Sequence, residues 1–303
     1  MTGVCKTHLT LVTVHFSVSA PSICEVDILD IEKKYANEFA WGDPVNYEGI
    51  LIYPVKVKYL MLFTQAASVL QITPLELTDI QYKSMSRLQF LLETFRMVDD
   101  PAAPESFKYI PQLFLVLLRL VLGEGQLVSL THPTDHRLDG KVLCITRPDF
   151  TDNTGLHKGA TLVLTNKKFE IFRKIVLLQN GVDITDEDVD PIMKKVYYED
   201  MKRLGQGKRK EIITEEDRLD LLSLNLHCYR QNLKEMPIRE YLEKTDKLLA
   251  RDVYLAQLNG QMTGFVKYKQ PPRHWLIRQT NKEKILGHFR TEEDIRGLLN
   301  DKG

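Results

Sequence analysis

The sequence predicts a mainly helical α+β protein with an N-terminal strand and a small antiparallel β insertion near residues 126–165. Apolar residues recur near the helical period before and after this insertion, whereas inside it short apolar runs alternate with glycine and proline. The composition, with 43% hydrophobic and 27% charged residues, is that of an ordinary globular protein. No segment repeats at a fixed period, which excludes solenoid and propeller folds.

Residues 1–48 are expected to form an N-terminal β segment. Apolar and polar residues alternate over residues 12–18, which gives an extended chain one apolar and one polar face. Polar residues interrupt every apolar stretch of this region, so it lacks the continuous apolar core of a signal peptide. We therefore expect a half-buried strand in a cytosolic protein.

Residues 49–125 are expected to form a helical domain. Three segments follow the helical period, at residues 55–72, 81–98 and 109–122. The last segment is apolar on nearly all sides and ends at Gly123, which is the pattern of a buried helix in a bundle.

Residues 126–165 change to short apolar runs separated by turn-forming residues. Asp139 followed by Gly140 is the strongest hairpin signal in this region. The expected strands cover residues 126–130, 141–146 and 160–164, with a polar loop at residues 149–158.

Residues 166–210 are expected to form a helical pair followed by a basic linker. Asn166 is the predicted cap of a first helix, and Gly181 is expected to end it. Asp190 followed by Pro191 predicts the start of the second helix, because a carboxylate can accept backbone N–H groups there.

Residues 211–303 are expected to form a C-terminal helical domain. A Thr–Asp capping box at residues 214–217 predicts one helix start. The longest predicted helix covers residues 238–258, and Gly260 is expected to break it. Two prolines keep the following segment, residues 265–272, extended. A short terminal helix is expected at residues 291–300.

The net charge of zero conceals an asymmetry along the chain. Residues 1–200 carry 20 basic and 26 acidic side chains, and residues 201–303 carry 21 basic and 15 acidic ones. Opposite net charges of this kind suit head-to-tail association of identical chains, or binding of an anionic partner by the basic C-terminal part. The alternative is that the two parts have solvated surfaces whose charges differ by chance. The most apolar stretch, residues 113–122, is far shorter than the ~20 residues that span a bilayer, so no membrane association is expected.

No motif in the sequence predicts a metal, a cofactor or a catalytic residue. Residues 186–190 have the oxygen spacing of a calcium loop, but Pro191 stands where that loop needs glycine. His132 and His136 flank a proline in a turn-rich segment, which does not suit a metal site. The four cysteines form no CxxC pair and are expected to be reduced thiols.

A basic segment rich in aromatic residues is the candidate interaction site. Aromatic rings between fixed positive charges suit stacking and phosphate contacts on single-stranded nucleic acid. The same alternation is also typical of an edge strand protected by lysines. The candidate residues are Phe265, Lys267, Tyr268, Lys269, Arg273 and Trp275.

Three stretches of the sequence resemble tail-assembly proteins of bacteriophages that infect Gram-positive bacteria. They read GILIYPV at residues 49–55, NKKFE through QNGVD at residues 166–183, and GQMTGF through PPRHW at residues 260–275. The resemblance implies a helical protein that is not an enzyme and that binds other tail or virion proteins. It places the protein in the cytoplasm of the host cell or in the virion.

The leading hypothesis is therefore a phage tail assembly or virion structural protein. Its interaction edge would be the helix at residues 238–258 with the extended segment that follows, and the protein is a candidate homo-oligomer. A nucleic-acid-binding accessory protein that uses the basic C-terminal third is the second hypothesis. An enzyme whose catalytic residues meet only in space is the third.

Overall fold

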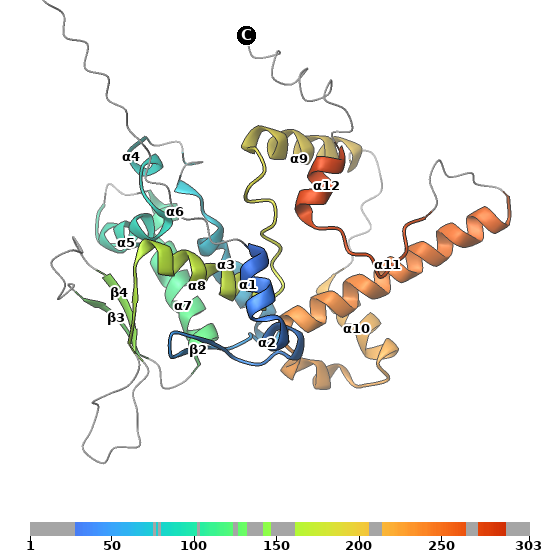
Figure 1. Ribbon diagram of the computed structural model, residues 1–303, viewed down its shortest axis with the longest axis horizontal. Helices are drawn as coiled ribbons and strands as arrows, with labels where there is room; N and C mark the ends of the chain where they lie inside the picture. The colour runs from blue at the N-terminus through green and yellow to red at the C-terminus, as the bar shows by residue number, and fades with distance from the viewer. Residues whose placement is uncertain are drawn as a thin grey trace, which may run out of the picture.

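The computed structural model describes residues 28–74, 77, 80–101, 104–123, 127–131, 142–146, 161–205, 214–264 and 272–288. They form a mainly helical α+β protein with two small antiparallel sheets, as the sequence predicts (Figure 1). The strand expected at residues 12–18 and the helix expected at residues 291–300 lie outside the described residues, as do residues 265–271.

The described part of the chain opens with two short helices, α1 (Ile28–Lys34) and α2 (Ala36–Trp41). The predicted β segment is therefore wrong for this region. The physical reason is that Ile28, Ile31 and the aromatic residues after them are three or four positions apart, and this spacing buries one helical face. A hairpin of β1 (Val45–Tyr47) and β2 (Ile50–Ile52) follows.

The helical region after β2 is built around one mostly buried helix. Helix α7 (Ile110–Leu122) is apolar on most sides, and Phe114 and Leu117 are fully buried, as the sequence predicts for this segment. The helix predicted at residues 81–98 is interrupted, because a capping box between Ser86 and Gln89 starts a new helix. The elements are η1 (Val57–Tyr59), α3 (Leu60–Gln71), α4 (Ile80–Lys83), α5 (Arg87–Met97), α6 (Glu105–Lys108) and α7 (Ile110–Leu122).

The predicted β insertion is confirmed as a three-stranded antiparallel sheet in the order β3-β4-β5. Its strands are β3 (Leu127–Thr131), β4 (Val142–Thr146) and β5 (Thr161–Leu164). Leu143 pairs with Leu164, and Ile145 pairs with Leu162, and all four side chains are buried. This face of the sheet belongs to the main hydrophobic core.

Two helices follow the sheet, α8 (Asn166–Gln179) and α9 (Pro191–Gly205). The cap of α8 is Thr165, whose hydroxyl accepts the N–H of Lys168, and not the predicted Asn166. Asn166 lies one residue inside the helix, where its side chain accepts a hydrogen bond from Ser86. The predicted cap of α9 is confirmed, because the Asp190 carboxylate accepts two backbone N–H groups of the first turn.

The C-terminal region contains α10 (Glu215–Asn225), η3 (Arg230–Glu235), α11 (Ile238–Met262) and α12 (Asn281–His288). The capping box predicted at the start of α10 is confirmed. The predicted break at Gly260 is wrong, since α11 continues to Met262. One glycine costs a helix only about 1 kcal/mol, and the left-handed residue that follows the helix is Gly264, with φ 73°.

The buried hydrophobic residues form two clusters. The larger one contains residues from α1 through α8 and Ile238, so it crosses several of the predicted domain boundaries. The smaller one joins α10, η3 and α11 to Val57. Ile238 donates its N–H to the carbonyl of Val55, which fixes the start of α11 to the body of the protein. No helix of the described part is both long and apolar enough to cross a bilayer.

Candidate interaction surface

The first half of α11 is held in place by α8, α10 and α2. Tyr241 is fully buried and donates a hydrogen bond to Glu215 of α10 over 3.0 Å. Burial, together with this carboxylate, raises the pKa of Tyr241. Arg239 lies over the ring of Phe39 and donates a hydrogen bond to the carbonyl of Leu178 over 2.8 Å. These contacts make the start of α11 a rigid base.

The second half of α11 extends away from the body of the protein (Figure 1). No residue of α11 after Thr245 is buried. Residues 253–264 contain no charged side chain, although Val253 is 58% exposed and Met262 is 85% exposed. A helix end that faces only water normally carries charged residues, so this end has the character of a covered surface.

A stripe of large side chains runs along α11 with a spacing of seven residues. Its members are Tyr241, Leu248, Leu255 and Met262, and we call them the seven-residue stripe. Tyr241 is fully buried, Leu248 packs against the smaller core, Leu255 is 48% exposed and Met262 is almost free. The same stripe that fixes α11 to the protein therefore continues beyond it.

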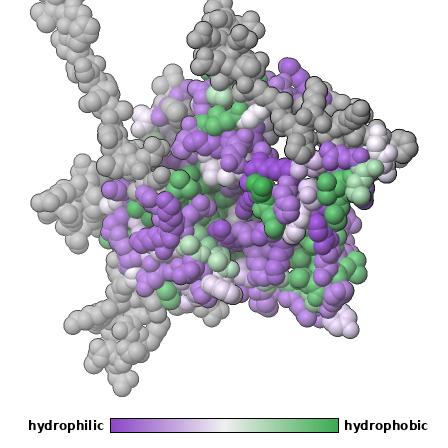
Figure 2. Space-filling model, turned by 45° about the vertical axis from the view of Figure 1, so that its right-hand side comes forward, coloured by the Kyte–Doolittle hydropathy of each residue, from purple (hydrophilic) through white to green (hydrophobic). Residues whose placement is uncertain are grey.

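Two neighbouring segments contribute further exposed apolar side chains. Asn225 at the end of α10 accepts a hydrogen bond from Arg251 over 3.3 Å. The ring of His274 lies 5.3 Å from the ring of Tyr254. Figure 2 shows hydrophobic side chains on the right-hand part of this face, the part that α10 and α11 form. We call the exposed apolar residues of this region the outer surface of α11. They are Val253, Leu255 and Met262 of α11, Leu224 of α10, and Leu276 and Ile277 before α12.

The structure brings one of the predicted interaction residues to α11. Trp275 is half-buried and stacks on His274, with ring centroids 5.8 Å apart, so that Tyr254, His274 and Trp275 form a ladder of rings. Arg273 is exposed beside this ladder. The other predicted residues, Phe265, Lys267, Tyr268 and Lys269, lie outside the described residues.

Some positive charges of this region are already neutralised within the protein. Arg278 lies 3.7 Å from Glu243, and Lys282 lies 3.5 Å from Asp188. Arg273 and Lys284 form no ion pair with any residue that the structure describes. The positive charge that is free for a polyanion is therefore smaller than the sequence indicates.

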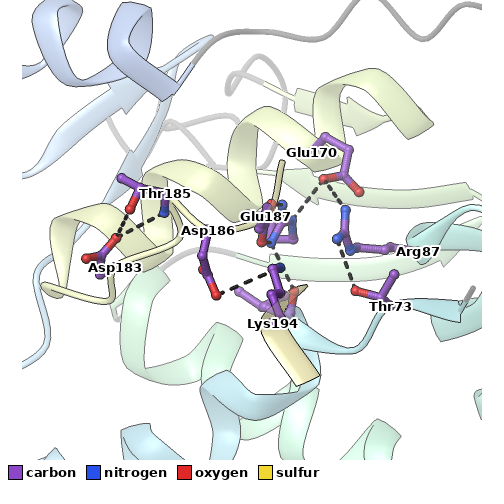
Figure 3. Close-up of polar contacts among 10 residues, drawn as sticks. Thr73, Arg87, Glu170, Asp183, Thr185, Asp186, Glu187 and Lys194 are labelled. Carbon is purple, nitrogen blue, oxygen red and sulfur yellow. Dashed lines mark hydrogen bonds and ion pairs between the residues drawn. The ribbon is translucent and has the colours of Figure 1, made fainter. Parts of the chain in front are cut away.

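A second polar feature is a buried cluster around Arg173 (Figure 3). Arg173 is completely buried, and its guanidinium contacts Glu170 over 2.9 Å and Glu187 over 2.7 and 2.6 Å. Arg87 joins the cluster through Glu170, at 3.2 Å, and through the hydroxyl of Thr73, at 3.3 Å.

Carboxylates of the acidic loop between α8 and α9 bond to other groups of the same chain. Burial raises the pKa of Glu187, but the hydrogen bonds and charge of Arg173 lower it more, so the net shift is downward. Burial also raises the pKa of Asp183. Hydrogen bonds from Thr185 and from the N–H of Asn281 lower this pKa more, so it lies below its ordinary value. The loop thereby fixes α8, α9 and the start of α12. Sequence reasoning missed the partner of Glu187, although an arginine among the apolar residues of α8 was a signal for it.

Two further features of the described residues are a cavity beside α2 and the distribution of possible metal ligands. A cavity of about 280 Å³ lies between the end of α2 and α11, with Trp41, 80% exposed, in its lining. Its charged side chains include Arg239 paired with Glu243 and Lys244 paired with Glu240. Within the described residues, no three His, Cys, Asp or Glu side chains gather to hold a metal ion. His132 and His136 lie outside the described residues.

The comparisons with known proteins add no relative to these observations. No protein-family model matches the chain, and no curated protein and no solved structure matches it.

Proposed function

We propose that this protein acts by binding other proteins during the assembly of a bacteriophage tail, as an assembly factor or a virion structural protein. The outer surface of α11 is the proposed binding element. The protein is not an enzyme on this proposal, and it works in the cytoplasm of the host cell or in the virion.

The uncharged, exposed end of α11 is the observation that carries the proposal. The centres of protein–protein interfaces are depleted of charge and enriched in aromatic residues and methionine. Residues 253–264 share the lack of charge and contain Tyr254 and Met262, while the base of the same helix is fixed by Tyr241 and Arg239. A rigid helix with an apolar, uncharged end suits the insertion of one helix face into a groove of a partner.

The biological context of the proposal comes from the resemblance to tail-assembly proteins. Two of the three resembling stretches lie at β2 and along α8, in the main core. The third begins at Gly260, in the last turn of α11. The resemblance thus includes part of the outer surface as well as the core.

The experiment is a binding assay between the purified chain and the purified tail proteins that are encoded beside its gene. We expect at least one of them to bind, with little weakening between about 50 and 200 mM salt, because apolar contacts are not screened. Leu255→Arg should abolish this binding. Leu115→Arg is the matched control, because Leu115 is 50% exposed on α7, away from the outer surface. Absence of binding to every tail protein would contradict the proposal.

A nucleic-acid-binding function is the second candidate, and the ladder of Tyr254, His274 and Trp275 beside Arg273 favours it. Base stacking on such rings, combined with phosphate contacts, gives affinity that falls steeply between ~50 and ~200 mM salt. Labelled single- and double-stranded nucleic acid, titrated over this range, tests it. Sub-micromolar binding that a Lys267→Ala, Lys269→Ala, Arg273→Ala variant abolishes would favour this function over the first.

A further inference from the structure

We infer that α9 and α12 form one opening unit, in which the two helices detach together while the hydrophobic clusters of the body stay folded. The hydrogen bond from the N–H of Asn281 to the carboxylate of Asp183 is the latch that keeps this unit closed. Neither helix contributes a residue to the outer surface of α11, so the inference is independent of the proposed function.

The start of α12 is capped by side chains from a distant part of the chain. The first N–H groups of a helix have no partner within the helix and need one elsewhere. The N–H of Asn281 bonds to Asp183 over 2.8 Å. The N–H of Lys282 bonds to the hydroxyl of Thr185 over 3.4 Å, and the third N–H group bonds to Thr280 in its own segment. Two of the first three N–H groups of α12 therefore depend on the acidic loop.

Helix α12 is too short to persist without this cap. It has eight residues, and isolated helices shorter than about 12–15 residues are marginal in water. Ile285 is its one buried residue, and this side chain belongs to neither hydrophobic cluster of the described residues. Breaking the latch therefore unwinds α12 without disturbing either cluster.

Helix α9 depends in turn on α12. No residue of α9 whose side chain the structure describes is buried, and α9 packs mainly against α12. The ring of His288 lies 5.4 Å from the ring of Tyr197, and its Nε2 lies 3.1 Å from the carboxylate of Asp200. Figure 1 shows the two helices beside one another and apart from α7 and the sheets. When α12 unwinds, α9 loses its main partner.

The acidic loop separates the fixed body from the opening unit. Ile184 belongs to the larger cluster, and Glu187 is held by Arg173, so this part of the loop stays on α8. The ion pair that joins Lys194 of α9 to Asp186 of the loop spans 3.8 Å. A long pair of this kind gives α9 little hold once α12 has left.

Opening changes the surface that the protein presents. In the closed form Ile285 is fully covered and Tyr197 is half-buried. In the open form both side chains lose this cover. Segments with few buried contacts are the ones that open locally while the core remains folded, which is how conformational switches are built.

Hydrogen–deuterium exchange of the full chain, measured by mass spectrometry, tests the inference. In the wild type, α9 and α12 should exchange at similar rates, faster than α7 and α8 and slower than an unstructured peptide. Ile285→Ala removes the buried side chain of α12 and should accelerate exchange in both α12 and α9 about tenfold. Leu286→Ala is the matched control, because Leu286 is the next residue of α12 and is 47% exposed.

A second variant tests the latch itself. Asp183→Ala should accelerate exchange in both helices about fivefold, which is the effect of losing one helix cap. Asp188→Ala is the control in the same loop, because the pair of Asp188 with Lys282 is exposed and spans 3.5 Å. Circular dichroism of each variant establishes that its body is folded. Equal exchange in the two variants would show that Asp183 is not the latch.

Three results would overturn the opening unit. The first is wild-type protection of α9 and α12 that equals the protection of α7 and α8, or that is absent. The second is an Ile285→Ala variant that accelerates exchange in α12 but not in α9, because the helices would then open separately. The third is equal acceleration in α7 and α8, because the whole protein would then unfold at once.

Discussion

The guanidinium of Arg173 donates two parallel hydrogen bonds to the carboxylate of Glu187, over 2.7 and 2.6 Å. Arg173 is completely buried in α8, whereas Glu187 belongs to the loop before α9. A charge at such a depth is stable only when it is paired and hydrogen-bonded. The pair therefore fixes the acidic loop on α8, and the loop in turn holds the start of α12 through Asp183.

Glu187→Gln should destabilise the protein by about 3 kcal/mol, since the buried guanidinium then keeps Glu170 alone as an anionic partner among the described residues. Urea unfolding followed by circular dichroism measures the change. Glu93→Gln is the control, because Glu93 pairs with Arg96 on an exposed helix face, and such a pair contributes less than about 1 kcal/mol. Equal losses in the two variants would contradict the buried pair.

Acid should destabilise the protein partly through the same carboxylate. The pKa of Glu187 lies below its ordinary value of 4.5, since the effect of Arg173 exceeds the opposing effect of burial. Its contribution to stability is therefore fully present above about pH 4.5 and is lost as the pH falls through the lower pKa of the folded state. Thermal unfolding between about pH 3 and 7 should show a smaller acid-dependent decrease of Tm for Glu187→Gln than for the wild type. Parallel curves would show that Glu187 does not titrate in this way.

Leu117→Asp should destabilise the protein by several kcal/mol, because Leu117 is fully buried in α7 and a carboxylate there would be removed from water. Leu115→Asp places the same group on the same helix at a position that is 50% exposed, and should cost less than about 1 kcal/mol. The denaturant midpoints of the two variants measure the difference. An unchanged midpoint for Leu117→Asp would contradict the position of α7 in the core.

Gly42→Ala should cost more than Gly264→Ala, although both glycines have a positive φ, of 69° and 73°. The positive φ alone costs alanine about 1–2 kcal/mol. At Gly42 the added Cβ would also lie 2.7 Å from Cγ of Pro237, while at Gly264 it would meet no atom of the described residues within 4 Å. Thermal unfolding at a low micromolar concentration compares the two variants. Equal shifts would mean that α2 does not pack closely on Pro237.

Local signals account for the elements that the sequence predicts correctly. The apolar run that becomes α7, the Asp190 cap and the Thr214 capping box each depend on residues within one or two turns. The three strands of the insertion follow from short apolar runs between turn residues. The β segment predicted for residues 1–48 is wrong at α1 and α2. These two helices are too short for a helical period to be distinguished in the sequence from a half-buried extended chain.

Tertiary contacts decide the features that the sequence does not reveal. Glu187 meets Arg173 because the loop folds back on α8. The sequence shows an arginine among the apolar residues of α8, but it does not show which carboxylate pairs with it. The interaction edge that the sequence predicts at the helix near residues 238–258 stays a prediction. Which half of this helix is buried depends on where Val57 packs, which lies far away in the chain.

The larger core also sets the order in which the protein can fold as it is made. The N–H of Val55 bonds to the side chain of Asn180, and α7 packs in the same cluster as α8. About 60 residues separate the end of α7 from Asn180, so the ribosome needs roughly 3–12 seconds to supply them. During this time the apolar surface of α7 lacks its partner helix. The speed of translation between these two points therefore determines how long each new chain is exposed to aggregation.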